Sequence, residues 1–266
     1  MSKHVPRKRF GQNFLRDDNI IAQIVASIAP QPGDRIIEIG PGQGALTEPL
    51  MQHTGRLEVI ELDRDLIPLL KNKFAYQGEI IIYNQDVLTF DFASLSQEAN
   101  SLRVVGNLPY NISTPLLFHL VSFQNIIQDM HFMLQKEVVD RICAHPHSKD
   151  YGRLSVMMQY YCHAEHLFNV PPEAFYPPPK VDSAIIRLIP RSQLELIAED
   201  EKSLAKIVQA SFAQRRKTLR NNLKTFLSDE QIKSLGIDPG CRAETLSLND
   251  FVALANSYHQ ASENTP

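Results

Sequence analysis

Short apolar runs alternate with segments of helical periodicity along the first half of the chain. A first helix is predicted over residues 19–29, with Asp17 or Asp18 as its N-cap. The apolar runs that predict strands are 35–39, 57–61, 80–83, 102–106 and 129–135, and helices are predicted over 45–52, 65–74, 113–121 and 136–143. Alternation on this scale is typical of an α/β fold, a mostly parallel sheet with helices on both faces.

Two later strands and a proline-rich loop follow a further predicted helix at 153–161. The strands, 163–170 and 183–189, are predicted to add an antiparallel edge to the sheet. The loop between them, 170–181, contains five prolines, which exclude a helix and stiffen it. It holds Phe175 and Tyr176 either as rigid aromatic side chains beside a ligand pocket or, with Phe175 in the core, as a stiff connector.

The pattern changes after Pro190, where strand signals end and helical periodicity alone remains. We therefore predict two domains, an α/β domain over residues 1–195 and a small all-helical domain over 196–266. Residues 1–18 form a basic arm that lacks periodicity, and we expect this arm to be mobile without a ligand.

Composition limits the class of protein. The chain has 266 residues, 43% of them hydrophobic, and no apolar run of the length that spans a membrane. Cys143, Cys162 and Cys241 lie far apart and predict neither a disulfide framework nor a metal site. We expect a cytoplasmic, metal-free monomer, since no coiled-coil pattern indicates an oligomer.

Charge is distributed unevenly although the net charge is only −3. Basic residues crowd the first ten positions and the segment 202–224. Local basic patches govern phosphate contact more than net charge does, although such clusters can also be solvated faces. The candidate RNA-binding residues are Lys8, Arg9, Arg215, Arg216, Lys217, Arg220 and Lys224.

Chemistry-bearing residues follow four of the predicted strands. Gly40, Gly42 and Gly44 follow the first, where they allow a tight turn and a close approach of backbone to ligand. Glu61 ends the next strand, at the spacing of a carboxylate that binds ribose hydroxyls, and Asp86 follows the third. Because parallel strands in open α/β sheets bind ligands beyond their carboxyl ends, we predict a nucleotide-type site at this edge.

The tetrapeptide Asn107-Leu108-Pro109-Tyr110 ends the fourth strand and suits an adenine amine. Asn107 offers a side-chain carbonyl acceptor, and Pro109 favours extended geometry at Leu108, which can direct the Leu108 carbonyl outward. Tyr110 offers a flat ring for stacking.

Taken together, these motifs resemble one family, the rRNA adenine dimethyltransferases. The resemblance covers nearly the whole chain and rests on Gly11–Leu15, Glu38–Gly44, Glu61–Asp63, Gln85–Val87, Asn107–Tyr110 and Phe175–Val181. Residues 107–120 and 212–223 are most similar to bacterial members that modify the small subunit, whose loss gives kasugamycin resistance.

The resemblance implies a Rossmann-like class I methyltransferase domain that uses S-adenosyl-L-methionine and releases S-adenosyl-L-homocysteine. It implies that the methyl donor is bound by Asn13, Leu15, Gly40, Gly42, Glu61, Leu62, Asp86, Val87 and Asn107. The residues it implies at the target base are Asn107, Leu108, Pro109, Tyr110 and Phe175.

The implied reaction is dimethylation of two adjacent adenosines near the 3′ end of 16S rRNA within immature 30S subunits, with a role in late assembly. Three alternatives stay open: a non-catalytic RNA-binding assembly factor, a DNA adenine methyltransferase, and the related large-subunit resistance methylase. The glycine spacing and the absence of an evident proton-relay histidine disfavour a nicotinamide dehydrogenase.

Overall fold

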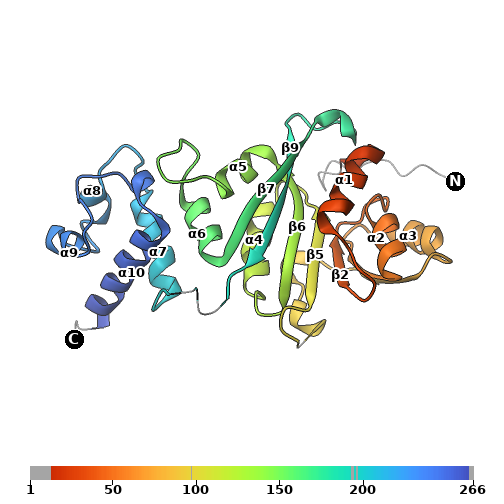
Figure 1. Cartoon of the computed structure of the whole chain (residues 1–266), viewed down its shortest axis with the longest axis horizontal. Coiled ribbons are helices and arrows are strands. Elements are labelled where there is room, and N and C mark those ends of the chain that lie inside the picture. Colours follow the sequence, from red (N-terminus) through yellow and green to blue (C-terminus); the bar gives the residue numbers. More distant parts are fainter. Residues whose placement is uncertain (1–12, 97, 193–194, 196, 264–266) are drawn as a thin grey trace. The chain divides into compact units, whose positions relative to one another are not determined.

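The computed structural model describes residues 13–96, 98–192, 195 and 197–263 (Figure 1). The predicted mobile arm is therefore described only from Asn13, and Lys8 and Arg9 lie outside the described residues. The chain divides into two compact units, one reaching to Val139 and including Glu165–Pro190, the other formed by Asp140–Ala164 and residues from Arg191 onward.

This division differs from the predicted boundary at residue 195. Residues 140–164 group with the helical unit, because helix α6 (Arg153–Tyr161) packs there against helices α7 (Glu201–Ser211) and α10 (Leu248–Glu263). Periodicity predicts the helix at 153–161, but it does not predict which other helices this helix packs against.

The first unit is built on a seven-stranded sheet in the order β4-β3-β2-β5-β6-β9-β7 (Figure 1). Its strands are β2 (Arg35–Ile39), β3 (Arg56–Ile60), β4 (Glu79–Tyr83), β5 (Leu102–Asn107), β6 (Ile127–Gln135), β7 (Cys162–Val170) and β9 (Ser183–Pro190). The pairs from β4 to β6 are parallel and β9 runs antiparallel to β6. The α/β class and the antiparallel addition to the sheet are confirmed.

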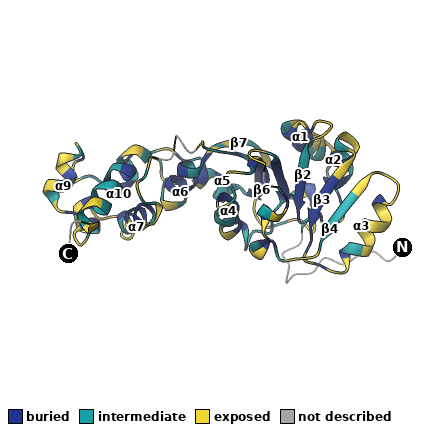
Figure 2. Cartoon of the chain, turned by 90° about the horizontal axis from the view of Figure 1, so that it is seen from below, coloured by how far each residue is buried: buried dark blue, intermediate teal, exposed yellow. Residues whose placement is uncertain are grey.

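The predicted helices are present, and in this unit they are α1 (Asp18–Ile28), α2 (Thr47–Thr54), α3 (Leu66–Phe74) and α4 (Ser113–Val121). The boundary between the two units falls within α5 (Lys136–Ile142). The Asp17 side chain caps α1 by accepting from the Asn19 and Ile20 amides at 2.9 and 3.1 Å. Figure 2 shows the inner strands buried and the outward side of α3 exposed. The turns η2 (Val87–Thr89), η3 (Phe92–Ser94) and η4 (Pro172–Ala174) complete the connections.

A two-stranded antiparallel ribbon joins the arm to the proline-rich loop. It pairs β1 (Phe14–Leu15) with β8 (Phe175–Tyr176), with Phe14 opposite Tyr176 and Leu15 opposite Phe175. Directly opposite residues share a face of such a ribbon. Leu15 and Phe175 face the hydrophobic core, where they are 6% and 4% exposed.

The second unit is helical where it is described beyond residue 196, apart from turns such as η6 (Ala243–Thr245). Besides α6, α7 and α10 it contains α8 (Leu219–Leu223) and α9 (Asp229–Ser234). Phe212 packs against two buried aromatic rings of this unit, with ring centroids 6.2 Å from Tyr151 and 5.6 Å from Phe251. The helical prediction for this part of the chain is confirmed. None of the helices among the described residues is long and apolar enough to cross a membrane.

A buried charged cluster lies near the amino-terminal ends of β5 and β6. Arg103 donates to both Asp129 carboxylate oxygens at 3.0 and 2.9 Å and to Asp34 at 2.6 Å. His131, two residues along β6 from Asp129, is 3% exposed. Burial, which disfavours the imidazolium, lowers the pKa of His131 to about 4; Asp129 opposes this shift, whereas Arg103 and Arg187 add to it.

Because of the lowered pKa of His131, we expect the protein to lose stability in mild acid. Because the folded-state pKa is below the ordinary value of 6.5, the folded protein binds this proton less well than the unfolded chain does. The contribution of neutral His131 to the free energy of unfolding is fully present above about pH 6.5 and is lost as the pH falls toward 4. Relative to a His131→Leu variant, wild type should lose about 2 kcal/mol of unfolding free energy between pH 7.5 and pH 5. Urea denaturation at both pH values measures this difference, and a constant difference contradicts it.

Candidate methyl-donor and adenine site

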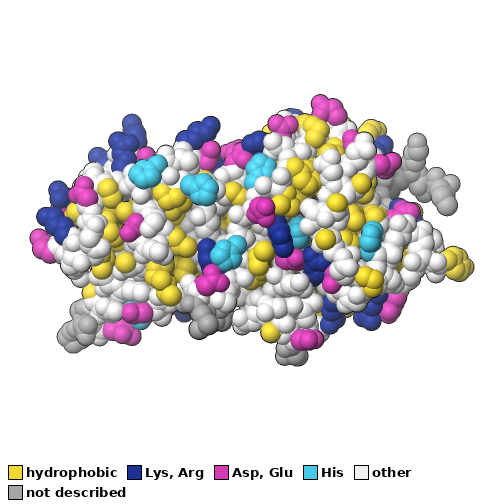
Figure 3. All heavy atoms as spheres, in the orientation of Figure 1, with side chains coloured by type: hydrophobic (Ala, Val, Ile, Leu, Met, Phe, Trp, Pro, Cys, Tyr) yellow, Lys and Arg dark blue, Asp and Glu magenta, His cyan; other side chains and the backbone are white. Residues whose placement is uncertain are grey.

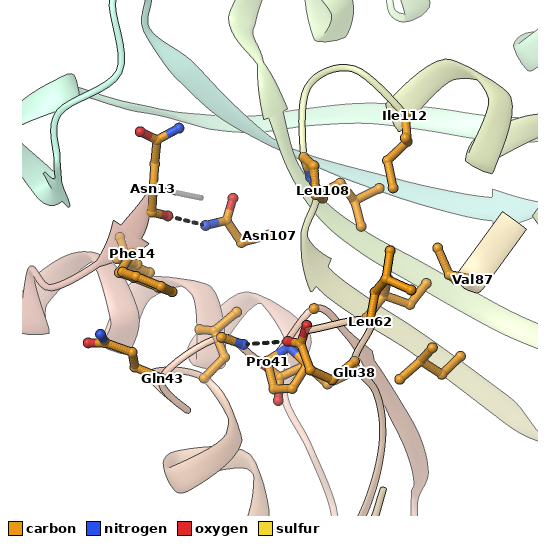
Figure 4. A pocket seen from close by; sticks show the side chains of 18 of the residues that line it. Asn13, Phe14, Glu38, Pro41, Gln43, Leu62, Val87, Asn107, Leu108 and Ile112 are labelled. Atoms are coloured by element: carbon orange, nitrogen blue, oxygen red, sulfur yellow. Dashed lines mark hydrogen bonds between the residues drawn. The ribbon is translucent and has the colours of Figure 1, made fainter. Parts of the chain in front are cut away.

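A cavity of about 340 Å³ lies beyond the carboxyl ends of β2, β3, β4 and β5 (Figure 4). Its walls include the predicted residues Asn13, Leu15, Gly40, Gly42, Glu61, Leu62, Asp86, Val87, Asn107, Leu108, Pro109 and Tyr110. The structure thus brings together side chains and backbone from five separate segments of sequence. The volume is in the range of small-molecule sites.

The glycine loop after β2 forms the floor of the cavity. Gly40 and Gly42 have φ values of +67° and +57°, which favour glycine. The Gly40 amide donates to the Ile60 carbonyl at 2.9 Å, which fixes the loop against the end of β3. A Cβ atom on Gly42 would lie 3.2 Å from the Phe14 ring, so β1 covers this loop closely. Phe14 lines the cavity and was not singled out by sequence reasoning.

Glu61 places a buried carboxylate in the cavity wall. It is 6% exposed, and burial raises the pKa of its carboxyl group. One oxygen accepts from the Asp63 amide at 2.7 Å and the other from the Gly42 amide at 3.4 Å. These bonds orient the carboxylate, and a diol is a chemically suitable partner for an acceptor held in this way.

Glu38 is a second buried acid in the wall, and the site prediction missed it. It accepts from the Thr47 hydroxyl at 2.6 Å. The pKa of Glu38 is raised to about 7, mainly by burial and in smaller part by Glu61, whereas the bond from Thr47 opposes the shift. Its position as an acid inside the strand that leads into the glycine loop was the available signal.

Asp86, Val87 and Leu62 form the third side of the cavity. Asp86 caps η2 through an oxygen that accepts from the Leu88 amide at 3.0 Å. Val87 is buried, whereas Leu62 is 49% exposed at the rim. An apolar wall beside a carboxylate suits a flat heterocycle that carries an amine. Among the described residues no cluster of three or more His, Cys, Asp or Glu side chains is placed to hold a metal.

Asn107 and Tyr110 are held on the remaining side by two long-range hydrogen bonds. The Asn107 side-chain amide donates to the Asn13 carbonyl oxygen at 3.1 Å (Figure 4). With the nitrogen engaged in this way, the Asn107 oxygen remains as the acceptor toward a ligand. The Tyr110 hydroxyl and the Ser183 hydroxyl lie 2.8 Å apart, and burial raises the pKa of Tyr110.

Phe175 is not among the residues that line the cavity, and its predicted place beside the target base stays a prediction. It packs in the hydrophobic core opposite Leu15, which both packs there and lines the cavity. This is the second interpretation of the proline-rich loop, in which Phe175 packs inside. The residue of β8 that points outward is Tyr176.

The predicted basic residues of the helical unit are exposed and are not part of the cavity. Arg215, Arg216, Lys217, Arg220 and Lys224 lie on α8 or the segments on either side of it. Arg215 pairs with Glu244 at 3.3 Å and Arg220 with Asp229 at 2.6 Å. Such exposed pairs contribute little to stability. Their contact with RNA stays a prediction.

The order of strands and the cavity define a Rossmann-like methyltransferase. The family model described as "Ribosomal RNA adenine dimethylase" matches residues 3–260, and the chain belongs to this family.

Named relatives and solved structures agree with this membership. The chain is 56% identical over 263 residues to "Ribosomal RNA small subunit methyltransferase A" of Hydrogenovibrio crunogenus, covering 98% of this chain and 99% of that protein. A dimethyladenosine transferase from Plasmodium falciparum has a similar structure, with a TM-score of 0.78, 25% identity and coverage of 94% and 98%. The 23S rRNA methyltransferase ErmE has a TM-score of 0.73, 26% identity and coverage of 93% and 100%.

Proposed function

We propose that this enzyme transfers methyl groups from S-adenosyl-L-methionine to the exocyclic amines of two adjacent adenosines near the 3′ end of 16S rRNA. The observation that carries the proposal is that Asn107–Tyr110 line the same cavity as the glycine loop, Glu61 and Asp86. The 56% identity to a small-subunit enzyme favours 16S rRNA over the 23S rRNA acted on by ErmE.

The residues of the cavity fit the proposed methyl donor. Gly40 and Gly42 leave room for it at the loop, because neither has a side chain there, and the oriented Glu61 carboxylate suits its ribose hydroxyls. Asp86 and Val87 supply the acceptor and the apolar contact for its adenine. When bound, S-adenosyl-L-methionine supplies a sulfonium methyl that is already activated, so the proposed reaction requires no metal.

The chain's own contribution is to grip and orient the target base. Adenine's amine nitrogen is a poor nucleophile because its lone pair is delocalised into the ring. The Asn107 side-chain oxygen and the Leu108 carbonyl are proposed to accept its two hydrogens, which favours a pyramidal nitrogen. Extraction of the base from its stack costs a few kcal/mol. Stacking on Tyr110 returns about 1–3 kcal/mol, and alignment of the reacting groups provides most of the acceleration.

Replacing Glu61 by glutamine is expected to weaken binding of S-adenosyl-L-homocysteine by about tenfold or more. The amide accepts hydrogen bonds less strongly than the carboxylate, and it presents an N–H where the wild type has an acceptor. Calorimetric titration measures the dissociation constant, with Glu48→Gln as the control, because Glu48 is a half-buried acid on α2 that pairs with Lys73 and does not line the cavity. Equal affinities of all three proteins would remove Glu61 from the binding site.

The proposed partner is 16S rRNA inside immature 30S subunits in the cytoplasm, with the protein acting as a monomer and contributing to late assembly. The exposed basic residues of the helical unit support contact with RNA. Figure 3 shows Lys and Arg side chains along the margin of that unit at the upper left of the view.

Methyl transfer to small subunits tests the proposal. Purified 30S particles from cells that lack this gene are incubated with the protein and S-adenosyl-L-methionine, and the rRNA is digested for mass spectrometry. Dimethyladenosine at two neighbouring positions of 16S rRNA is expected. Methylation only of 23S rRNA or of duplex DNA would contradict the proposal. Failure to bind the methyl donor at all would favour a non-catalytic assembly factor.

A further inference from the structure

The outer face of the β1–β8 ribbon has a feature that the proposed reaction has not used. Tyr176 is 52% exposed, although the Arg16 guanidinium lies over its ring at 4.2 Å from the centroid. Tyrosine carries a large apolar ring, and one that stays half-exposed on an ordered strand is suited to bind a partner.

The ribbon places this ring next to the cavity. Phe14 lines the cavity and is directly opposite Tyr176, so the two side chains share one face of the ribbon. The Arg16 amide donates to the Ala174 carbonyl at 2.8 Å, which continues the pairing and keeps Arg16 beside the same ring. Tyr176 itself is not among the residues that line the cavity. It therefore lies outside the site, beyond Phe14.

The chain that follows Tyr176 returns to Tyr110, an aromatic residue of the cavity wall. Ser183, seven residues further on, contacts the Tyr110 hydroxyl, and the Asp182 carbonyl accepts from the Lys136 amide at 2.9 Å. The carboxyl-terminal end of the proline-rich loop is thus fixed next to Tyr110, which lines the cavity. Lys180, in the same loop, is exposed. An aromatic ring with a guanidinium over it, and a further cation four residues along the same loop, matches the two components of single-stranded nucleic acid, a base and a phosphate.

We propose that Tyr176 and Arg16 form a stacking platform for the nucleotide adjacent to the adenosine in the cavity. This inference rests on the proposed function, since it requires a single-stranded substrate. The base stacks on the exposed surface of the Tyr176–Arg16 pair while Lys180 meets the backbone phosphate. In a substrate with two adjacent target adenosines, the adenosine outside the cavity occupies the platform.

A Tyr176→Ala variant of the full chain is expected to raise KM for unmethylated 30S particles about tenfold while kcat changes little. The dissociation constant for S-adenosyl-L-homocysteine and the thermal midpoint should match wild type. Tyr176→Phe keeps the ring and should restore the wild-type KM. Tyr76→Ala is the matched control, because Tyr76 is a fully exposed tyrosine on the turn between α3 and β4.

A second experiment identifies the base that occupies the platform. Particles in which one of the two adjacent adenosines is replaced by uridine test the platform, because uridine stacks less well. The uridine substitution should raise KM for wild type and have little further effect on Tyr176→Ala, so the two changes are non-additive. Additive effects would indicate that Tyr176 contacts something other than this base, such as a ribosomal protein, and would overturn the inference.

Other outcomes are also decisive. An unchanged KM for Tyr176→Ala, with wild type active, overturns the platform and leaves the proposed function intact. A parallel loss of donor affinity or thermal stability shows that Tyr176 holds the ribbon rather than a base, and this too overturns the platform. Absence of methyl transfer by wild type contradicts the proposed function and the platform with it.

Discussion

Replacing Asn107 by alanine is expected to lower kcat for methyl transfer into unmethylated 30S particles by about 100- to 1,000-fold. The change removes an acceptor oriented in the structure before substrate binds, and losing one such oriented hydrogen-bonding group in an active site costs about this much. It also removes the bond from Asn107, at the end of β5, to the carbonyl of Asn13, the residue that precedes β1. Radiolabelled methyl incorporation measures the rate.

Asn111→Ala is the control for this experiment. Asn111 is an exposed asparagine that also lines the cavity, four residues beyond Asn107. Its loss should change kcat by less than about threefold, because surface substitutions without such partners have small effects. Equal incorporation by wild type and Asn107→Ala would remove Asn107 from the mechanism.

Replacing Gly106 by alanine is expected to destabilise the first unit by about 3 kcal/mol or more. A Cβ atom at this position would lie 2.5 Å from the Ile39 carbonyl oxygen, a backbone atom of the neighbouring strand that cannot rotate away. Relief requires β2 and β5 to separate at the edge where Gly40 and Asn107 lie. This cost is a large fraction of the stability of a typical domain.

Gly152→Ala is the matched control for Gly106→Ala. Gly152 precedes α6, has φ of −170°, and a Cβ atom there would meet no atom within 4 Å. Its unfolding midpoint in urea should equal that of wild type, whereas Gly106→Ala should unfold at a clearly lower concentration. Similar midpoints for Gly106→Ala and wild type would contradict the tight β2–β5 contact.

The sequence predicted the edge of the sheet that carries the site because strand ends are marked by local signals. Gly40, Glu61, Asp86 and Asn107 each follow an apolar run, and parallel pairing places such positions side by side. The fold class followed from the same alternation. The roles of these residues toward ligands stay predictions.

Contacts between distant segments could not be predicted in this way. Asn13 and Asn107 are 94 positions apart, and no periodicity in the arm indicates that β1 pairs with β8. That pairing decides which of Phe175 and Tyr176 is buried. Sequence identified both as aromatic candidates, and only the register distinguishes them.

The burial of charged residues could not be predicted from the sequence pattern either. Arg103 and Asp129 sit inside or next to apolar runs, and their bidentate pairing requires β5 and β6 to be adjacent in a particular register. For Glu38, the only local signal of a buried acid at the cavity was its position inside the strand that leads into the glycine loop. Residues 140–164 likewise join the helical unit through tertiary packing that no single segment specifies.

A crystal structure of the protein with S-adenosyl-L-homocysteine tests the central claim most directly. The adenosine should contact Glu61 and Asp86, and the thioether sulfur should lie within about 4 Å of the space bounded by Asn107 and Tyr110, where a base can enter. A sulfur placed away from that opening, or a tetrapeptide closed off from any incoming nucleotide, would contradict the account.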